Sequence, residues 1–225
     1  SSIILGITAL VAINSFNYNL VRDIDNQTKT LLGADVKVTG NNFLPDTLQS
    51  ILDSLPGESA MEMELFSMAF VPKDQETQFV RVKAIEGNFP FYGELKVEPL
   101  SARDVYQEEE TALVDDGFMF EHDLVVGDKI KLGEITLTIS GRLMSTFGSV
   151  ALTSSFAPSV YISKKVLDET KLVQPGSLIE YAYYKKVEGD IDTEVWEDHA
   201  GRQKKFRDQN FRVTTLVDQT RNLNR

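Results

Sequence analysis

The chain has 225 residues, of which 42% are hydrophobic and 25% charged, a composition typical of a folded globular protein with a sizeable core. Its net charge of −11 at pH 7 disfavours binding to the phosphates of DNA or RNA and attraction to anionic lipid headgroups. The absence of cysteine excludes disulfide bonds, thiolate nucleophiles and cysteine-based zinc sites.

The first part of the chain predicts a helix whose character changes along its length. Residues 3–13 (IILGITALVAI) are apolar on every side. After them a single stripe recurs at intervals of three or four residues, at Phe16, Leu20, Ile24, Thr28 and Leu31. Gly33 then favours the end of the helix. The apolar run is shorter than the roughly 20 residues that span a bilayer.

Three interpretations of this apolar start remain open: a buried core helix, a signal peptide, or the outer end of a membrane helix. A signal peptide fits less well, because neither a basic leader nor a small-residue cleavage site is present. The chain begins with Ser1 and Ser2 and has no initial Met, which favours a fragment. On the third interpretation, residues 1–32 are the end of a membrane helix that continues as an amphipathic helix.

The following elements alternate between strand and helix patterns. In chain order we expect a strand at 34–39, a helix at 44–55 that ends at Pro56 and Gly57, and strands at 60–71 and 78–85 joined by a polar turn at 72–77. An aromatic, glycine-containing loop follows at 87–93. This segment therefore predicts one compact α+β unit.

The middle of the chain has a different residue pattern. Residues 98–110 are polar and are expected to be irregular, whereas 111–143 alternate in short runs that predict a compact all-β module with a one-turn helix at 117–123. Residues 146–158 predict a long mobile loop. A short strand at 160–162 and a helix to Glu169, capped by Ser163, complete this part.

The last part returns to the earlier order, with a strand at 178–186, a helix at 191–208 and a strand at 211–216. These elements mirror those of the first part. The sequence therefore predicts an α+β fold, in which a sandwich assembled from both ends of the chain carries a β-rich insertion.

The two histidines do not predict a metal site. His122 lies between Glu121 and Asp123, and neighbouring residues on one element point in different directions, so a surface histidine is expected. His199 lies in the predicted helix at 191–208 and is expected to be half-buried or exposed.

The carboxylate clusters also lack a catalytic or calcium-binding pattern. A calcium loop starting at Asp190 would need glycine at its sixth position, where Val195 stands, and glutamate at its twelfth, where Gly201 stands. Acidic residues at a helix start explain residues 190–194 better. Glu108–Glu110 and Asp115–Asp116 are interpreted as solvated loop edges.

Two groups of aromatic residues could form a ligand platform, but packing between sheet and helix is the expected role: Phe89, Phe91 and Tyr92 in one loop, and Tyr181, Tyr183 and Tyr184 in one strand. The sequence contains none of the phosphate-binding, dinucleotide, zinc-protease or serine-hydrolase signatures. We therefore predict no catalytic, cofactor-binding or metal-binding residue and no enzymatic activity.

Four segments, in the right order, carry a family resemblance: LLGADVKVTG at 31–40, VKAIEGNFPFYGEL at 82–95, the glycine-containing β-pattern at 112–143, and PSVYISKKVLDETKLVQPGSLIEY at 158–181. Together they resemble FtsX-like permeases of the YbbP type, which contain a MacB-like periplasmic core domain. Residues 172–177 (LVQPGS) match the closing part of the last motif nearly unaltered.

The resemblance implies a two-lobed periplasmic core. Residues 33–97 and 172–225 would form a membrane-proximal α+β lobe, and residues 98–171 an inserted, mainly-β lobe. It also implies anchoring in the cell inner membrane, with the domain facing the periplasm and a separate ATP-binding subunit on the other side.

The implied function is to couple ATP-driven motion of membrane helices to export or extraction of a hydrophobic or lipid-linked substrate. The alternative is a mechanotransmitting scaffold that regulates an extracytoplasmic partner such as a cell-wall hydrolase. The resemblance implies no nucleic-acid partner and supplies no catalytic residues.

Overall fold

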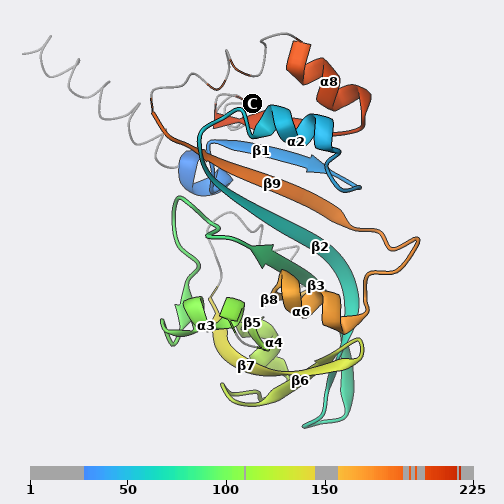
Figure 1. Cartoon of the computed structure of the whole chain (residues 1–225). Coiled ribbons are helices and arrows are strands. Elements are labelled where there is room, and N and C mark those ends of the chain that lie inside the picture. Colours follow the sequence, from blue (N-terminus) through green and yellow to red (C-terminus); the bar gives the residue numbers. More distant parts are fainter. Residues whose placement is uncertain are drawn as a thin grey trace, which may run out of the picture.

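The computed structural model describes residues 28–108, 110–144, 157–189, 193, 196, 201–216 and 218 (Figure 1). Its strands are β1 (Val36–Gly40), β2 (Gly57–Val71), β3 (Glu76–Glu86), β4 (Val97–Glu98), β5 (Thr111–Asp115), β6 (Lys129–Leu132), β7 (Ile135–Leu143), β8 (Ser159–Ser163), β9 (Glu180–Val187) and β10 (Arg212–Thr215). Its helices include α2 (Asp46–Leu52), α3 (Ala102–Glu108), α4 (Asp116–Glu121), α6 (Lys164–Thr170) and α8 (Arg202–Asp208).

All of these strands belong to one ten-stranded mixed sheet in the order β10-β1-β9-β2-β3-β8-β5-β7-β4, with β6 pairing with β2 and β7. The pairs β3–β8 and β5–β7 are parallel. Because β6 joins β7 back to the end of β2, the strands β2, β3, β8, β5, β7 and β6 close into a ring. The fold is therefore α+β, and part of its sheet forms a small closed barrel.

The long hairpin of β2 and β3 connects the two ends of the molecule. Residues 57–64 of β2 pair with β9 in the upper part of Figure 1, whereas Ala69 and Phe70 near its other end pair with β6 in the barrel. At about 3.3 Å per residue, the 15 residues of β2 span roughly 50 Å. The two-lobe division drawn from the sequence stays a prediction.

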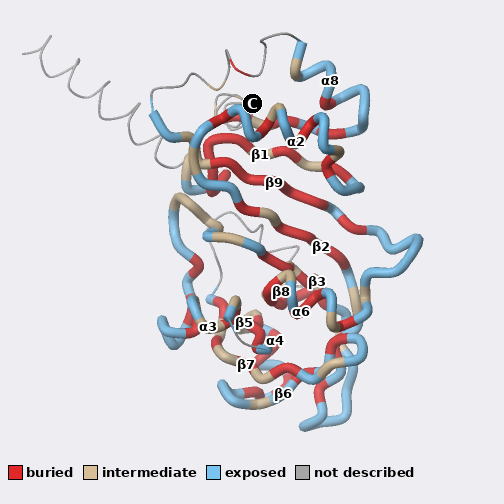
Figure 2. Tube along the Cα trace, viewed as in Figure 1, coloured by how far each residue is buried: buried red, intermediate tan, exposed pale blue. Residues whose placement is uncertain are grey.

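The upper part buries one face of its strands beneath helices. The alternating pattern of β1 places Val36 and Val38 in the core, next to Tyr183 on β9. Short helices α2 and α8 lie over this region, and Phe206 of α8 is fully buried (Figure 2). Tyr183 is buried, and its hydroxyl oxygen accepts a hydrogen bond from the Leu44 backbone nitrogen at 2.9 Å.

The chain enters and leaves this upper part at the same place. Strands β1 and β10 are antiparallel neighbours, and Val36 at the start of β1 lies opposite Thr215 at the end of β10. The short helical stretch at 28–32 leads directly into β1. Both described ends of the chain therefore lie together, at the end of the molecule away from the barrel (Figure 1).

Most elements predicted from periodicity are confirmed. The expected strands up to residue 85, the helix after Pro45, the one-turn helix α4 and the strand–helix pair β8–α6 all form. The side chain of Ser163 caps α6 by accepting a hydrogen bond from the Val166 nitrogen, as predicted. The alternating run that ends at Leu143 forms a single strand, β7.

The prediction that residues 98–110 are irregular is wrong, because most of them form β4 and α3. The sequence of α3 is polar, but Ala102 and Tyr106 lie four residues apart and share the buried face of the helix. They pack with Val97, Leu113 and Leu143, which lie on three different strands. This small second core stabilises a helix that the local pattern does not reveal.

Three sequence predictions fall on residues outside the described ones. These are the apolar helix start at 1–27, nearly all of the loop at 146–158, and most of the first half of the helix at 191–208. Helix α8 covers only the last part of that range, and it begins after Gly201, whose positive φ of 67° interrupts a helix; the prediction of one continuous helix is therefore wrong at this residue. Within the part of the chain that the structure describes, no helix is long and apolar enough to cross a membrane.

Glycine is required at the turn between β6 and β7. Gly133 has a positive φ of 56°, and a Cβ atom there would overlap the carbonyl oxygen of Thr170, which accepts a hydrogen bond from the Glu134 nitrogen at 3.0 Å. We expect Gly133→Ala to lower the free energy of unfolding by about 2 kcal/mol in urea denaturation.

Gly201→Ala is the matched control for this clash. Gly201 has a similar positive φ, of 67°, but no atom of the described residues lies within 4 Å of its added Cβ, so only about 1 kcal/mol of backbone strain is expected. Equal losses in the two variants would contradict the proposed overlap with Thr170.

Candidate functional site

The first candidate site is the junction at which the chain enters the sheet. The carbonyl of Gly33 accepts hydrogen bonds from the backbone nitrogens of Phe91 at 2.8 Å and Tyr92 at 3.3 Å. Gly33 has a positive φ of 72°, and a Cβ atom there would meet the ring of Phe89 at 2.8 Å. The backbone of the helix exit is therefore held directly against the aromatic loop.

Asp35 fixes the same junction from the side. It is only 6% exposed, and its Oδ2 atom accepts two hydrogen bonds of 2.8 Å, from the Tyr92 hydroxyl and from the backbone nitrogen of Val187. Burial and the adjacent Asp35 carboxyl raise the pKa of the Tyr92 phenol above its usual value. One carboxyl thus joins the start of β1, the loop at 87–93 and the end of β9.

The expectation that the aromatic residues serve packing is supported by their contacts. Phe89 stacks on Tyr184 with a ring-centroid distance of 3.8 Å, and Phe91 meets Phe89 edge-on at 6.4 Å. On the other face of β9, Tyr181 packs against Phe43 at 4.5 Å. Tyr181 and Tyr183 share a face and Tyr184 points away, as predicted. These rings bury the junction and the helix-covered core.

A second group, the ion cluster, consists of Glu62 and Glu64 on β2 and of Arg81 and Lys83 on β3. The Lys83 ammonium lies 3.0 Å from a carboxylate oxygen of each glutamate. Arg81 lies 3.5 Å from Glu64. Burial alone would lower the pKa of Lys83, but Glu62, Tyr161 and Glu64 raise it above its usual value. Lys83 therefore keeps its positive charge throughout the physiological pH range.

Buried tyrosines beside the ion cluster predict a loss of stability in alkali. Burial raises the pKa of Tyr161 from its usual 10 to about 12, with Lys83 opposing and Glu62 adding to this effect. Because the folded-state pKa is the higher one, the stabilisation is present below pH 10 and is lost as the pH rises toward 12.

We expect the free energy of unfolding to fall steeply over this pH window, and Tyr161→Phe to reduce the slope. Denaturation at a series of pH values, with tyrosinate absorbance as a second signal, measures both. A slope that Tyr161→Phe leaves unchanged would contradict the buried-phenol explanation. Exposed tyrosines cannot produce this pH dependence, because they titrate equally in the folded and unfolded states.

An exposed apolar surface lies farther along the same face of the hairpin. We call Phe66, Met68, Phe70 and Phe79 the hairpin patch; their exposed fractions are 52%, 49%, 36% and 47%. Phe66 and Phe79 are stacked with centroids 5.4 Å apart. Met68 and Phe70 border a shallow surface hollow that also involves Lys131 and Leu172. Exposed apolar side chains gathered in this way are typical of contact surfaces.

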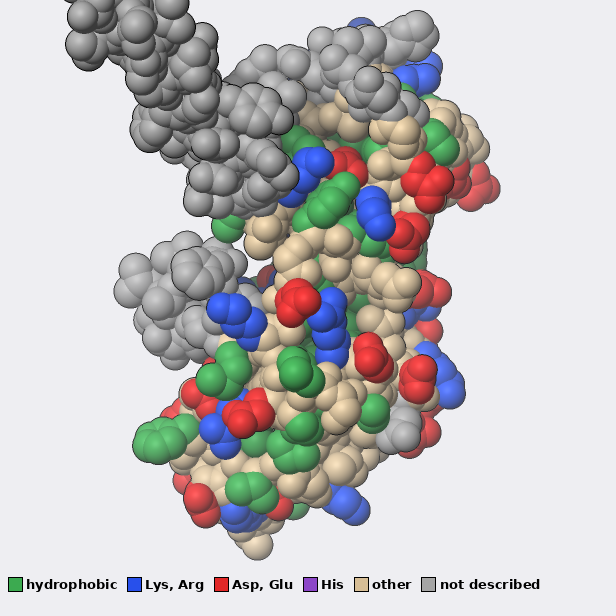
Figure 3. Space-filling view, turned by 90° about the vertical axis from the view of Figure 1, so that its left-hand side faces the viewer, with side chains coloured by type: hydrophobic (Ala, Val, Ile, Leu, Met, Phe, Trp, Pro, Cys, Tyr) green, Lys and Arg blue, Asp and Glu red, His purple; other side chains and the backbone are tan. Residues whose placement is uncertain are grey.

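The face of the molecule seen in Figure 3 shows a mixed surface on its lower, barrel end. Hydrophobic side chains are spread there among Lys, Arg, Asp and Glu side chains, without a large region of one charge. The net negative charge of the chain is therefore not concentrated into one patch on this face.

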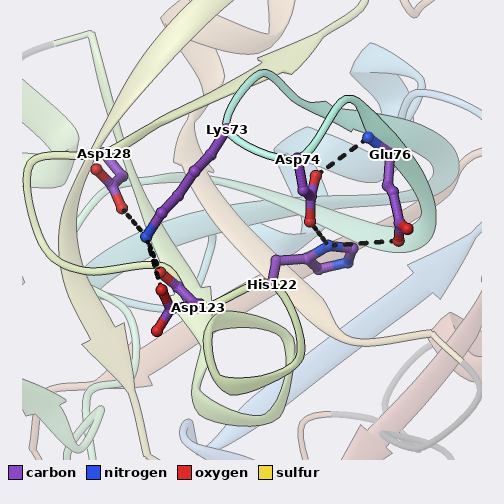
Figure 4. A network of polar contacts seen from close by, with 6 residues as sticks. All are labelled: Lys73, Asp74, Glu76, His122, Asp123 and Asp128. Carbon is purple, nitrogen blue, oxygen red and sulfur yellow. Dashed lines mark hydrogen bonds and ion pairs between the residues drawn. The ribbon is translucent and has the colours of Figure 1, made fainter.

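The third group of polar residues lies at the far tip of the hairpin, where the turn between β2 and β3 contacts α4 (Figure 4). Lys73 donates a hydrogen bond to the carbonyl oxygen of Asp123, and its ammonium lies 3.3 Å and 3.6 Å from the carboxylates of Asp123 and Asp128. These contacts fasten the hairpin turn to the loop after α4.

The prediction that His122 is a surface residue is wrong. Its side chain is only 2% exposed and packs edge-on against Phe118 at 4.8 Å. Its Nδ1 atom lies 2.6 Å from Asp74 Oδ2 and 4.0 Å from Glu76 Oε2. The hydrogen bond to His122 lowers the pKa of the Asp74 carboxyl. The contact between His122 and Asp74 could not be predicted from the local pattern, because the two residues are 48 positions apart.

Among the described residues, Asp74, Glu76 and His122 form a group that could hold a metal ion, with ligand atoms within 4.8 Å of one another. The sequence neighbours Glu121 and Asp123 are not members of this group. Asp115 caps α4 by accepting from the Gly117 nitrogen, and Asp116 pairs with Arg142 at 3.2 Å. His199 and most of 190–194 lie outside the described residues.

Comparisons with known proteins agree with this architecture. The family model described as the MacB-like periplasmic core domain matches residues 1–214. The chain is 21% identical over 179 residues to an uncharacterized ABC transporter permease, YbbP of Escherichia coli (strain K12), which covers 80% of this chain. This chain spans only 22% of the length of that relative.

Two solved structures share the fold. The periplasmic region of MacB from Actinobacillus actinomycetemcomitans is 13% identical, with a TM-score of 0.58, and the match covers 87% of this chain and 95% of the other. A domain of a putative permease from Porphyromonas gingivalis is also 13% identical, with a TM-score of 0.50 over 84% of this chain and 97% of the other. With the family match, the resemblance seen in the sequence is confirmed: the chain belongs to the MacB-like periplasmic core domains and is an extracytoplasmic domain of an ABC transporter permease.

Proposed function

We propose that this domain transmits ATP-driven movement of membrane helices to a hydrophobic or lipid-linked substrate outside the inner membrane. A separate ATP-binding subunit would supply the energy, and the domain itself would catalyse no reaction. On this proposal, the end of the sheet that contains β1, β9 and β10 lies next to the membrane. The barrel, built from residues 98–171 together with the far end of the β2–β3 hairpin, extends away from it.

The observation that carries the proposal is the pairing of Val36 with Thr215. Two membrane helices that flank the domain could reach these neighbouring positions from a single bilayer surface. A relative movement of the two helices would then act on adjacent strands of a continuous sheet. Hydrogen-bonded strands and a packed core transmit such a displacement because they resist compression.

Two further features support transmission over a distance. Asp35 and the Gly33 carbonyl fasten the helix exit to the loop at 87–93 and to β9, so that the N-terminal helix does not end in a free linker. The hairpin of β2 and β3 continues from there into the barrel. Movement at the junction would therefore reach the barrel through strands rather than through a flexible loop.

The hairpin patch favours an apolar substrate. Its four side chains are exposed on the barrel, and burial of such side chains against a lipid or hydrophobic cargo is favourable by about 25 cal/mol per Å2. Arg81 of the ion cluster is partly exposed and lies 5.6 Å from the centroid of the Phe66 ring, where it would meet a polar or charged headgroup. We expect cargo contact at this face.

The test uses the full-length permease and its ATP-binding subunit in liposomes that contain a fluorescent lipid. We expect ATP-dependent extraction of the lipid, reduced several-fold by the double substitution Phe66→Ser and Phe79→Ser. Phe120→Ser is the control, because Phe120 is 88% exposed on α4 and lies outside the hairpin patch.

ATP-dependent activation of a cell-wall hydrolase, without lipid extraction, would contradict the transport proposal and support the scaffold alternative. Equal loss of extraction in the Phe120→Ser control would contradict the assignment of cargo contact to the hairpin patch.

A further inference from the structure

We propose that Asp74, Glu76 and His122 form a binding site for one divalent transition-metal ion, for which Zn2+ is the best match, and that the ion fastens the tip of the β2–β3 hairpin to α4. The proposal is independent of the transport function. It rests on the geometry of three side chains that two distant segments bring together (Figure 4).

The distances require only small side-chain movements. Bonds of about 2.0–2.1 Å in a tetrahedral site place two ligand atoms roughly 3.3 Å apart. His122 Nδ1 now lies 2.6 Å from Asp74 Oδ2 and 4.0 Å from Glu76 Oε2. On binding, the Asp74 oxygen would therefore move away from His122 Nδ1 and the Glu76 oxygen would move toward it, each by less than about 1 Å. A rotation about the side-chain bonds of the turn residues suffices.

The histidine is already oriented as a ligand. Its side chain is held by burial and by the contact with Phe118, and Nδ1 points toward the two carboxylates. A ligand fixed in this way loses little conformational freedom on binding. The Asp74 side chain is 31% exposed and is held near His122 by its Oδ1 atom, which accepts a hydrogen bond from the Glu76 nitrogen at 3.1 Å. The Glu76 side chain is 71% exposed, which leaves it free to adjust and leaves a path for the ion from solvent.

The other ring nitrogen does not oppose binding. Nε2 of His122 is buried and has no hydrogen-bond partner among the described residues. Coordination through Nδ1 moves the ring proton to Nε2, so that the same nitrogen lacks a partner in both states, as an acceptor without the ion and as a donor with it. The hydrogen bond from Nδ1 to Asp74 is replaced by the two metal bonds.

The charges match a divalent ion. Two carboxylates and a neutral imidazole give the bound site no net charge, which is favourable beside a buried ring. The nearby Lys73 does not compete, because its ammonium is directed away from Asp74 and toward Asp123 and Asp128 (Figure 4). Lys73 instead holds the turn in place, so that the ligands from β2–β3 stay near α4.

The combination of one imidazole and two carboxylate ligands favours some metal ions over others. Imidazole nitrogen favours Zn2+, Cu2+ or Ni2+ over Mg2+ and Ca2+, which prefer oxygen ligands alone. Three protein ligands leave the fourth tetrahedral position for water. Without a thiolate ligand, we expect a dissociation constant on the order of 1–10 μM. Protons compete for all three ligands, so that affinity decreases with decreasing pH.

The test is titration of the chelator-treated, tag-free 225-residue chain with ZnCl2, followed by calorimetry and by thermal unfolding. We expect one Zn2+ per chain and a rise of roughly 5 °C in melting temperature at saturation. Co2+ is a second probe, because it should give the visible absorption bands of a tetrahedral nitrogen–oxygen site.

Glu76→Gln is the principal variant, because Glu76 is mostly exposed and its substitution should not affect folding. We expect it to weaken Zn2+ binding at least tenfold and to remove the tetrahedral Co2+ bands. Glu121→Gln is the matched control: Glu121 is exposed and adjacent to His122, but it lies outside the group, so binding should be unchanged.

Absence of stoichiometric binding below about 100 μM would overturn the proposal. Binding that survives Glu76→Gln would also overturn it, since the ion would then occupy another place. Asp74→Asn provides a second variant, and its loss of binding with an unchanged melting temperature of the metal-free protein would support the site. None of these results depends on whether the permease moves lipid.

Discussion

Lys83→Met should lower the free energy of unfolding by about 4 kcal/mol at pH 7. Lys83 is the cation between two glutamates, and the side chain of Glu62 is only 7% exposed. Removing the ammonium leaves that carboxylate partly desolvated and without its cation, which is more costly than loss of an exposed ion pair. Met preserves most of the aliphatic volume, so packing contributes little to the difference.

The double variant Glu62→Gln with Lys83→Met separates charge from packing. Since it removes both members of the buried pair, we expect it to recover at least half of the stability lost in Lys83→Met. Lys129→Met, at an exposed position on β6, is the control and should change stability by less than about 0.5 kcal/mol. A loss in Lys83→Met as small as that of the control would contradict the role assigned to the ion cluster.

Asp35→Ala should lower the free energy of unfolding by about 3 kcal/mol, because it leaves the partly buried Val187 nitrogen and the Tyr92 hydroxyl without their acceptor. Each hydrogen bond to this buried carboxyl is expected to contribute between about 1.5 and 3 kcal/mol, with incomplete additivity. Urea denaturation measures the loss, and hydrogen exchange at Val187 should increase.

Two further variants serve as comparisons for Asp35→Ala. Tyr92→Phe removes only one of the two hydrogen bonds and should cost about 1.5 kcal/mol, with the Val187 amide still protected. Asp208→Ala removes an exposed carboxylate at the end of α8 and should have almost no effect. Hydrogen exchange at Val187 that is equally fast in wild type and Asp35→Ala would show that Asp35 does not hold β9 at the junction.

The sheet could be predicted from the sequence where alternation is strong. Leu65, Ala69 and Val71 alternate with exposed residues on β2, and the pattern of β1 is equally regular. The sequence pattern of the ion cluster is also regular, because Glu62 and Glu64 lie two residues apart on one strand, as do Arg81 and Lys83 on the next. Charges with period two indicate one face of a strand.

Closure of the barrel could not be predicted, because it depends on pairs between β2 and β6 that involve only Ala69, Phe70 and their partners. Helix α3 was missed for a related reason: its buried face consists of two residues, and it is stabilised by strands far away in sequence. His122 was misjudged because its burial and its carboxylate partners come from the tip of a hairpin 48 residues earlier.

Two of the segments that carry the family resemblance are in direct contact in the structure. Residues 31–40 and 82–95 each carried part of the family resemblance, and the structure joins them through Gly33, Asp35 and Tyr92. The contact explains why both segments contain their characteristic residues: one supplies the backbone and carboxyl acceptors, and the other supplies the donors and the rings.

The most direct test of the account measures how far three labelled positions lie from the outer leaflet in the full-length permease. Single cysteines at Leu31, Thr214 and Glu121 can be labelled selectively once any cysteines elsewhere in the permease are replaced, because this chain itself contains none. Energy transfer to a lipid-bound acceptor then reports each distance. The account predicts that Leu31 and Thr214 lie close to the bilayer and that Glu121, beyond the roughly 50 Å hairpin, lies far from it. A label at Glu121 closer to the bilayer than either of the others, or a large difference between Leu31 and Thr214, would contradict anchoring of the domain at one end.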